Sequence, residues 1–269
     1  MNKLIVRIGL VMIMSVCLLI PVFSQSQAFD QVESMPEIVS EEQPIMIEIP
    51  VEATPTPTEP EVAPITQPFY LIDVPIISQN PELFNGCEVT SLAMLLLTTS
   101  NPVDKLDLAD MLEKDPTEII KDEDGQILFW GDPEVGFVGS ITGDGDGYGV
   151  FHGPIATLLN QIIPGQALDL TGFSFEEVLA QSINIGIPVV VWTNIYFATD
   201  YSWLFWESNN GTVWATWREH AVLLVGYDDY YVYVNDPFDG LAAKPVEKYG
   251  FLASWEQMGM QAVTYRIIQ

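Results

Sequence analysis

Residues 219–237 read Glu219-His-Ala-Val-Leu-Leu-Val-Gly-Tyr-Asp-Asp-Tyr-Tyr-Val-Tyr-Val-Asn-Asp-Pro237. The part before Asp228-Asp229 is an almost unbroken apolar run, and the part after it is rich in tyrosine and valine. Residues of these types favour β-strands, and two such runs separated by a short polar turn are typical of an antiparallel hairpin. This stretch predicts that the C-terminal part of the chain, about its last 60 residues, folds as an antiparallel sheet.

The hairpin also places a histidine beside an acid or an amide. A three-residue turn over residues 227–229 would set His220 directly opposite Asp236, with Cβ atoms roughly 5 Å apart, and would turn Asn235 to the other face. A register different by one residue would bring Asn235 onto the face of His220. Either side chain could hold the imidazole in one tautomer, as the third member of a catalytic triad does. The pattern favours Asp236 and leaves Asn235 open.

The preceding part of the chain combines helices with a few strands. Residues 188–193 are expected to be a strand. Residues 69–77, which contain a proline, are expected to be either an edge strand or an extended lead-in to the domain. The Gly- and Asp-rich residues 122–149 are expected to form a long loop. Helices are expected over residues 87–97, 105–113, 153–163 and 174–184. Helices gathered early and strands gathered late predict an α+β fold, with N-terminal helices packed on a C-terminal antiparallel sheet.

Two segments precede the expected domain. Residues 1–28 have a positive start, an apolar run from Ile8 to Phe23 and a small-x-small cleavage site, which predicts a signal peptide; a retained anchor is the alternative. Residues 29–68 hold nine acidic residues, no basic ones and many prolines, which predicts a disordered or semi-rigid spacer. The folded domain is therefore expected over residues 69–269. A secreted or cell-surface product follows, with a cell-wall or membrane tether through the N-terminal segment as one option.

The charge excludes one class of partner. The chain has 37 acidic and 9 basic residues, a net charge of −28, and the expected domain alone carries −21. Nucleic acid is excluded because so few basic side chains are present to release counterions from phosphate. Anionic membrane surfaces are disfavoured for the same reason. The acidity indicates either solubility outside the cell, which we favour, or attraction to a cationic substrate.

Cys87 is the cysteine that would remain after the signal peptide is removed. It follows Asn85-Gly86 and opens the expected helix over residues 87–97. A helix N-terminus stabilises a thiolate relative to a thiol, and the thiolate is the nucleophile. The alternative is a buried, inert thiol. The thiol, His220 and Asp236 together predict a catalytic set, because three unrelated structural roles would otherwise have to supply a nucleophile, a base and an orienting group.

Other features give weaker indications. His152 is expected to have a structural role where a loop meets a helix. The acidic turns at residues 122–125 and 144–146 lack the spacing of an EF-hand loop, and the histidines and cysteine lack that of a zinc site, so no metal or other cofactor is expected. Residues 192–217 contain five tryptophans, which form either a packed hairpin or a binding wall for apolar side chains or sugar faces.

Three blocks of sequence carry a family resemblance: Asn85-Gly-Cys-Glu-Val-Thr-Ser-Leu-Ala-Met94, Gly149-Val-Phe-His-Gly-Pro-Ile-Ala156 and Val234-Asn-Asp-Pro237. They resemble the peptidase C39-like family of the papain-like cysteine peptidases, over about residues 71–263. The resemblance implies a papain-like fold, with Cys87 as nucleophile, His220 as general base and Asp236 as third member. A glutamine upstream of the cysteine supplies an oxyanion-hole donor in such enzymes, and Gln79 is the residue at that place.

These observations predict a secreted, monomeric cysteine peptidase that hydrolyses peptide bonds of a peptide or protein substrate through Cys87, His220 and Asp236. One alternative is a peptidoglycan amidase or endopeptidase, which uses the same Cys–His chemistry. Another is a surface module that keeps the fold and binds a ligand through its aromatic wall without catalysis. The sequence does not identify the substrate.

Overall fold

The computed structural model describes residues 70–268. The expected signal peptide and the whole of the acidic spacer lie outside these residues. Within residues 70–268, no helix has both the length and the apolar character that a bilayer-spanning segment needs.

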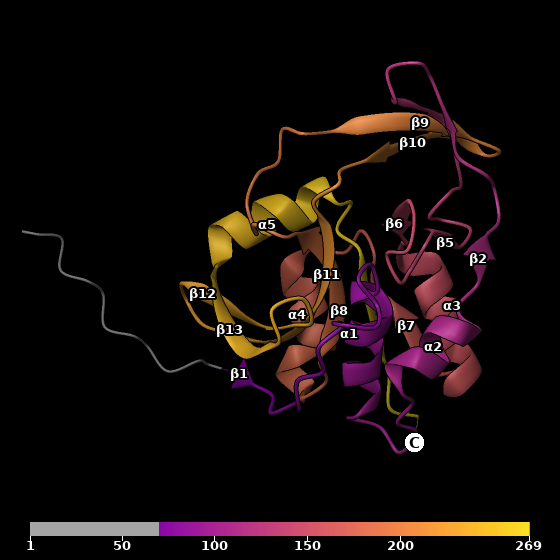
Figure 1. The fold of residues 1–269 in the computed structure, drawn as a ribbon. Helices are drawn as coiled ribbons and strands as arrows, with labels where there is room; N and C mark the ends of the chain where they lie inside the picture. Colours follow the sequence, from indigo (N-terminus) through magenta and orange to yellow (C-terminus); the bar gives the residue numbers. More distant parts are fainter. Residues whose placement is uncertain (1–69, 269) are drawn as a thin grey trace, which may run out of the picture. The chain divides into compact units, whose positions relative to one another are not determined.

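A seven-stranded sheet forms the centre of this domain (Figure 1). Its strand order is β13-β12-β11-β8-β14-β7, with β1 paired to β11, and every pairing in it is antiparallel. The strands are β1 (Tyr70–Leu71), β7 (Ala167–Asp169), β8 (Val189–Asn194), β11 (Glu219–Tyr227), β12 (Tyr231–Asp236), β13 (Leu241–Glu247) and β14 (Ala262–Tyr265). The antiparallel sheet predicted from the C-terminal sequence is present, and the strand predicted over 188–193 corresponds to β8.

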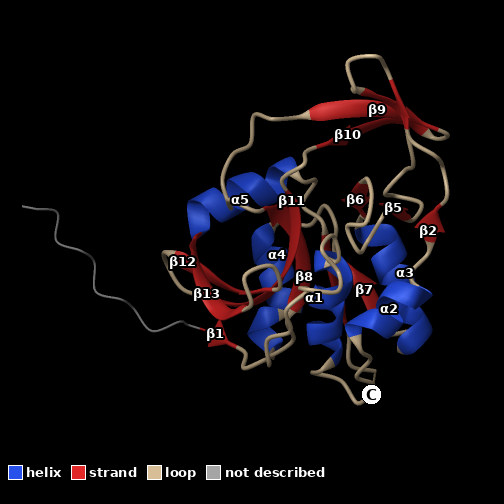
Figure 2. Ribbon diagram, viewed as in Figure 1, coloured by secondary structure: helices blue, strands red, loops and turns tan. Residues whose placement is uncertain are grey.

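Helices cover both faces of this sheet (Figure 2). They are α1 (Cys87–Leu96), α2 (Lys105–Met111), α3 (His152–Ile162), α4 (Phe175–Gln181), the 3-10 turn η1 (Ile183–Ile185) and α5 (Lys248–Gln257). Alternate residues of β8 and β11 point to opposite faces. Val190 and Leu223 pack in the core with α1, α2 and α3, whereas Val191 and Val222 pack in the core with α4 and α5. Burial on both faces explains why β11 is apolar almost throughout.

Two smaller sheets lie beside the main one (Figure 1). One has the order β10-β9-β4-β3, and the other has the order β2-β5-β6. Their strands are β2 (Lys114–Asp115), β3 (Ile120–Lys121), β4 (Ile127–Phe129), β5 (Phe137–Gly139), β6 (Gly147–Gly149), β9 (Leu204–Ser208) and β10 (Gly211–Ala215).

The prediction of a long loop over residues 122–149 is wrong, because β4, β5 and β6 lie within it. These strands are three residues long; β4 pairs with β9 and β5 pairs with β2, both outside the segment, while β6 pairs with β5. The glycines reflect close packing: a Cβ on Gly139 would lie 2.3 Å from the carbonyl oxygen of Asp146. Glycine therefore marks a close backbone approach at this position, in addition to the left-handed φ of 79°.

One further prediction needs correction, because the last 60 residues contain helix α5 as well as strands. For residues 69–77 the sequence left an edge strand or a lead-in open; the strand is limited to Tyr70–Leu71, and the chain from there to α1 carries no regular strand. The four expected helices are present as α1 to α4, with ends shifted by a few residues. The mixture of helices with a central antiparallel sheet confirms the α+β class.

Candidate active site

Helix α1 begins at Cys87, and its first turn places the thiol beside the central sheet. Gly86 precedes it, and a Cβ on Gly86 would lie 2.7 Å from Cβ of Leu83, so this approach of the chain requires glycine. Cys87 is 5% exposed. The backbone N–H of Ala221, the residue after His220, donates a hydrogen bond to Cys87 Sγ over 3.4 Å. The helix start and the start of β11 are thereby joined at the sulfur atom.

His220 and Asp236 are in direct contact. His220 Nε2 and Asp236 Oδ1 are 2.8 Å apart, and both residues are 2% exposed. This hydrogen bond leaves Nδ1 as the ring nitrogen that is available to exchange a proton with another group. The interaction joins β11 to the end of β12, as the hairpin predicts.

The predicted register of the hairpin is nevertheless wrong. Leu223 pairs with Asn235, so Asp236 lies diagonal to His220 and not directly opposite it. The hydrogen bond from Asp228 N to the carbonyl oxygen of Tyr231 closes a longer turn than the predicted one, and the register shifts again between Leu224 and Gly226. Together, the longer turn and this register shift move the strand pairing at His220 by two residues from the predicted one. An even displacement keeps a side chain on the same face of the sheet.

Asn235, the other residue considered as the partner of His220, is used elsewhere. Its Nδ2 donates to the carbonyl oxygen of Val74 over 2.8 Å, and its Oδ1 accepts from the backbone N–H of Ala243 over 2.9 Å. It therefore fastens the lead-in segment and β13 to β12. The contact with His220 belongs to Asp236.

Lys244 holds the other oxygen of Asp236. Its Nζ donates to Asp236 Oδ2 over 2.8 Å and to Asp239 Oδ2 over 2.6 Å, and it lies 5.0 Å from the ring centroid of Phe197. Burial opposes ionisation of Asp236, but the hydrogen bonds and charges of His220 and Lys244 outweigh it and hold the pKa of that carboxyl well below its usual range. Asp236 is consequently an anion with both oxygens engaged. Sequence reasoning missed Lys244, because nothing in its local sequence links it to Asp236.

Gln79 lies beside Cys87 and is 2% exposed. Its backbone N–H donates to the carbonyl oxygen of Pro237, and its Nε2 donates to the carbonyl oxygen of Phe84 over 2.6 Å. Its Oε1 is buried and has no hydrogen-bond partner within residues 70–268. One Nε2 hydrogen remains for a ligand after the bond to Phe84. The loop before α1 thus brings Gln79 to the thiol despite the eight-residue separation.

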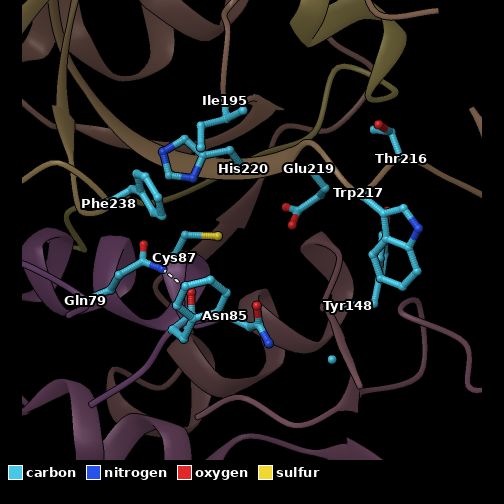
Figure 3. Close-up of a pocket in the computed structure, with 12 residues that line it drawn as sticks. Gln79, Asn85, Cys87, Tyr148, Ile195, Thr216, Trp217, Glu219, His220 and Phe238 are labelled. Atoms are coloured by element: carbon cyan, nitrogen blue, oxygen red, sulfur yellow. Dashed lines mark hydrogen bonds between the residues drawn. The ribbon is translucent and has the colours of Figure 1, made fainter. Parts of the chain in front are cut away.

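The four residues selected from the sequence, Gln79, Cys87, His220 and Asp236, therefore come together, and three of them line one pocket (Figure 3). The pocket has a volume of about 220 Å³. Its wall is formed by Gln79, Phe84, Asn85, Cys87, Gly147, Tyr148, Ile195, Thr216, Trp217, Glu219, His220 and Phe238. Asp236 lies behind His220 and does not line the pocket.

Two carboxylates near the thiol were not selected from the sequence: Glu219 lines the pocket, and Glu88 is buried beside Cys87. Glu88 follows Cys87 and Glu219 precedes His220, so their position next to the two selected residues is the signal that could have found them. Cys87 Sγ lies 3.4 Å from Glu88 Oε2, and the sulfur and one oxygen of each glutamate all lie within 4.8 Å of one another. This is the one group of such side chains in residues 70–268 with the spacing to hold a metal ion.

These carboxylates change the acidity of the thiol. Burial raises the pKa of Glu88 to about 7, and burial together with the charge of Glu88 raises the pKa of Glu219 well above its usual range. Burial, followed by the charges of Glu88 and Glu219, raises the pKa of Cys87 well above its ordinary value, against the opposing N–H of Ala221. The expectation that the helix N-terminus favours a thiolate is therefore reversed by burial and by the two acids.

The remaining features singled out in the sequence lie away from the thiol or contribute only in part. His152 begins α3, and its Nδ1 lies 2.6 Å from Asp169 Oδ2, outside the lining of the Cys87 pocket. Among the tryptophans of residues 192–217, Trp192 and Trp206 are buried, whereas Trp214 and Trp217 are more than half exposed. Trp217 alone of these four lines the pocket.

A thiol at a helix start, an imidazole with a carboxylate partner and a nearby amide are the groups that cysteine-dependent hydrolases use. Comparison with known proteins identifies the family within this broad class. Residues 71–263 match the model of the Peptidase C39 like family, so the chain belongs to this family.

Two known proteins are similar to this chain. The uncharacterised protein YvpB of Bacillus subtilis (strain 168) is 40% identical over 183 residues, which is 68% of this chain and 70% of YvpB. The crystal structure of a candidate C39-like peptidase from Bacillus anthracis is 41% identical and superposes with a TM-score of 0.67, covering 74% of this chain and 98% of that one. The family resemblance seen in the sequence is confirmed.

Proposed function

We propose that this protein is a papain-like cysteine peptidase in which Cys87 attacks the carbonyl carbon of a peptide bond. The observation that carries this proposal is the buried hydrogen bond between His220 and Asp236, beside a pocket that also holds the thiol. Membership of a peptidase family supports the same reaction class. A fold kept only for binding would not require a buried, fully engaged Asp236 behind the imidazole.

In the first step, His220 acts as general base. Its Nε2 is held by Asp236, so Nδ1 accepts the proton of Cys87 as Sγ bonds to the carbonyl carbon. The raised pKa of Cys87 means that the free protein holds a thiol, and the proton leaves during the attack. The imidazolium that forms is stabilised by the Asp236 anion, whose charge Lys244 keeps in place.

The negative charge that develops on the carbonyl oxygen needs donors. As the first residue of α1, Cys87 has a backbone N–H that precedes the intrahelical hydrogen bonds. The Gln79 amide, fixed by its bonds to Phe84 and Pro237, supplies the second donor. Two such donors are the physical requirement for stabilising a tetrahedral oxyanion.

The second half of the reaction balances the first. The C–N bond breaks, Nδ1 of His220 returns its proton to the leaving amine, and a thioester joins the substrate acyl group to Cys87. Water then attacks the thioester carbon while His220 accepts its proton; the C–S bond breaks, the carboxylic acid product leaves, and His220 gives the proton to Sγ, which restores the thiol. No metal or other cofactor takes part in this scheme.

Cleavage of a peptide library by the full chain tests the proposal, with Cys87→Ala as the matched control. We expect new peptide termini with the parent protein and none with Cys87→Ala or His220→Ala. A parallel digest of purified peptidoglycan, monitored by released amines, tests the amidase alternative. Release from peptidoglycan without cleavage of the library, or identical digests from parent and Cys87→Ala, would overturn the peptidase assignment.

We also propose that the protein is a secreted monomer that acts outside the cell, with the acidic residues 29–68 as a spacer and the N-terminal segment as a removable signal. The composition of these segments supports this. N-terminal sequencing of protein recovered from the culture medium should give a start at Phe29. Recovery only from the cell envelope with Met1 intact would show a retained anchor, and sedimentation measures the oligomeric state.

A further inference from the structure

The pocket at Cys87 has two chemically different ends (Figure 3). Gln79 and Phe238 lie at one end, close to the ring of His220, and the proposed reaction uses this end. Glu219 and Trp217 lie at the other end, and the thiol lies between the two groups. The reaction as derived above gives the second end no task.

Within residues 70–268, the two carboxylates near the thiol have no cationic partner. None of the ion pairs formed within residues 70–268 includes Glu88 or Glu219. Arg218 adjoins Glu219 in the sequence, yet its Nη1 lies 2.7 Å from Asp200 Oδ1 and its guanidinium lies over Tyr196. Buried carboxylates without a partner are costly in free energy, and proteins keep such groups chiefly at functional sites.

The carboxylates are nevertheless held firmly. Glu88 is fully buried, and its Oε1 accepts a hydrogen bond from the backbone N–H of Val150 over 2.7 Å. A Cβ on Gly149 would lie 2.6 Å from Glu88 Oε1 and 3.0 Å from Glu219 Oε2. The chain after β6 therefore passes directly beside both side chains, and the absence of a side chain on Gly149 makes room for them.

The carboxylate at this end of the pocket has an oxygen without a hydrogen-bond partner in the described residues. Glu219 Oε1 is shielded from solvent and has no hydrogen bond within residues 70–268, although Glu219 lines the pocket. The rings of Tyr148 and Trp217 line the same end, with centroids 6.2 Å apart. A carboxylate acceptor beside aromatic faces is the environment that binds an ammonium or guanidinium group, through a charge-assisted hydrogen bond and cation–π attraction.

We infer that the Glu219 end of the pocket binds the basic side chain of a peptide substrate, a lysine or an arginine next to the bond that is cleaved. The cation favours the ionised form of both acids: Glu219 loses its proton to solvent and pairs with the cation, Glu88 adds its charge from behind, and Trp217 and Tyr148 cover the aliphatic part of the side chain. This inference rests on the proposed peptidase function and names the substrate class of the same site.

A bound cation also affects the nucleophile. The charges of Glu88 and Glu219 oppose loss of the Cys87 proton, and a positive group between them cancels this opposition. Binding of a basic substrate would then make it easier for Cys87 to lose its proton and attack the carbonyl carbon. Part of the preference for basic substrates should therefore be in kcat and not only in KM. Substrates without a basic group would meet a thiol that holds its proton more tightly.

Matched peptide pairs test the inference with the full chain. Each pair differs at one position beside the scissile bond: lysine against norleucine, or arginine against citrulline, so length and polarity are kept as far as possible while the charge is removed. We expect kcat/KM to be about tenfold or more higher for the charged member, with kcat contributing. EDTA is included so that no metal ion bound by Cys87, Glu88 and Glu219 competes.

Glu219→Gln is the variant that removes the charge and keeps the shape. Its ratio of kcat/KM between charged and neutral peptides should fall close to one. Glu256→Gln is the matched control, because Glu256 is exposed on α5 and the substitution changes the net charge equally. Unchanged selectivity in Glu219→Gln, or an equal loss in both variants, would overturn the subsite.

Two further measurements test the subsite separately from the proposed peptidase function. Binding of the lysine and norleucine peptides to the Cys87→Ala protein, followed by tryptophan fluorescence, requires no catalysis; equal affinities would disprove the subsite even if no peptide were cleaved. Salt separates the local site from the acidity of the whole domain, because screening weakens long-range attraction more than a shielded contact. Selectivity that disappears in roughly 1 M salt would assign it to the surface charge and reject Glu219 as its source.

Discussion

Lys244 and His220 hold opposite oxygens of one carboxylate, that of Asp236, each over 2.8 Å. The arrangement fixes the rotation of the Asp236 side chain, because a turn about its last bond would break both contacts. It also keeps the carboxylate ionised behind the imidazole. The His–Asp pair is therefore a three-residue network whose third member comes from β13, the strand after the hairpin.

We predict that Lys244 acts as a positioning residue. Lys244→Met removes the second contact of Asp236 while keeping the aliphatic stem, and kcat should fall by about tenfold with a smaller change in KM. Lys244→Arg restores a donor and a charge, so it should recover most of the loss. Steady-state kinetics at pH 7 measure both, and thermal unfolding monitors the fold. Equal kcat in Lys244→Met and the parent, or no recovery by arginine, would leave Lys244 with a structural role alone.

A second prediction separates Asp236 from Asn235. Asp236→Asn keeps the shape but takes away the charge that stabilises the imidazolium, so kcat should fall by about 100-fold or more. Asn235→Ala leaves the carbonyl of Val74 and the N–H of Ala243 without their partner, which should lower the free energy of unfolding by about 1–3 kcal/mol. Its kcat per folded molecule should stay close to that of the parent. A reversal of the two effects would make Asn235 the orienting residue.

The histidine and its partner could be predicted from the sequence because a β-strand repeats every two residues. The true register differs from the predicted one by two residues at the histidine, and an even difference leaves His220 and Asp236 on one face. The turn geometry that sets the register depends on Asp228, whose Oδ1 accepts from the N–H groups of Tyr230 and Tyr231. Such side-chain capping of a turn is not fixed by the apolar pattern.

Helix α5 and the direction of the Cys87 pKa shift could not be predicted from the sequence, because tertiary contacts decide both. Helix α5 contains Gly250 and starts at an unusual cap, Glu247, whose carboxylate accepts from the N–H groups of Tyr249 and Gly250. Gly250 is required because its Cβ would lie 2.6 Å from the carbonyl oxygen of Phe197. In the same way, burial in the tertiary structure, followed by the charges of Glu88 and of the sequence-remote Glu219, raises the pKa of Cys87, so the local helix-terminus argument gave the wrong direction for the thiol pKa.

The third prediction concerns the reactivity of the thiol. Because burial and the charges of Glu88 and Glu219 raise the pKa of Cys87, iodoacetamide should label the parent protein slowly near pH 7, and labelling should accelerate as the pH rises. Glu219→Gln removes one opposing charge and should increase the labelling rate by several-fold, most clearly above pH 7, where more of the parent carboxylates are ionised. Mass spectrometry of the labelled protein gives the rates, with Glu256→Gln as control. Slower labelling in Glu219→Gln than in the parent would show that this carboxylate assists loss of the Cys87 proton.

The fourth prediction concerns stability and pH, and it follows from Glu88. Burial raises its pKa from an ordinary 4.5 to about 7, so between these two pH values the unfolded chain has lost the proton and the folded protein still holds it. The folded state then binds more protons, and its stability falls as the pH rises through this window, by about 3 kcal/mol in all.

Glu88→Gln tests this, because the amide cannot titrate while its side-chain oxygen can still accept from the backbone N–H of Val150. The melting temperature of Glu88→Gln relative to the parent should therefore increase by several degrees between pH 4.5 and pH 8, measured by circular dichroism. Because the pKa of Glu219 is also raised, the stability of Glu88→Gln should still fall to some extent as the pH rises. A difference between Glu88→Gln and the parent that stays constant over this range would show that Glu88 is ionised in the folded protein throughout, and that the charge beside Cys87 is permanent.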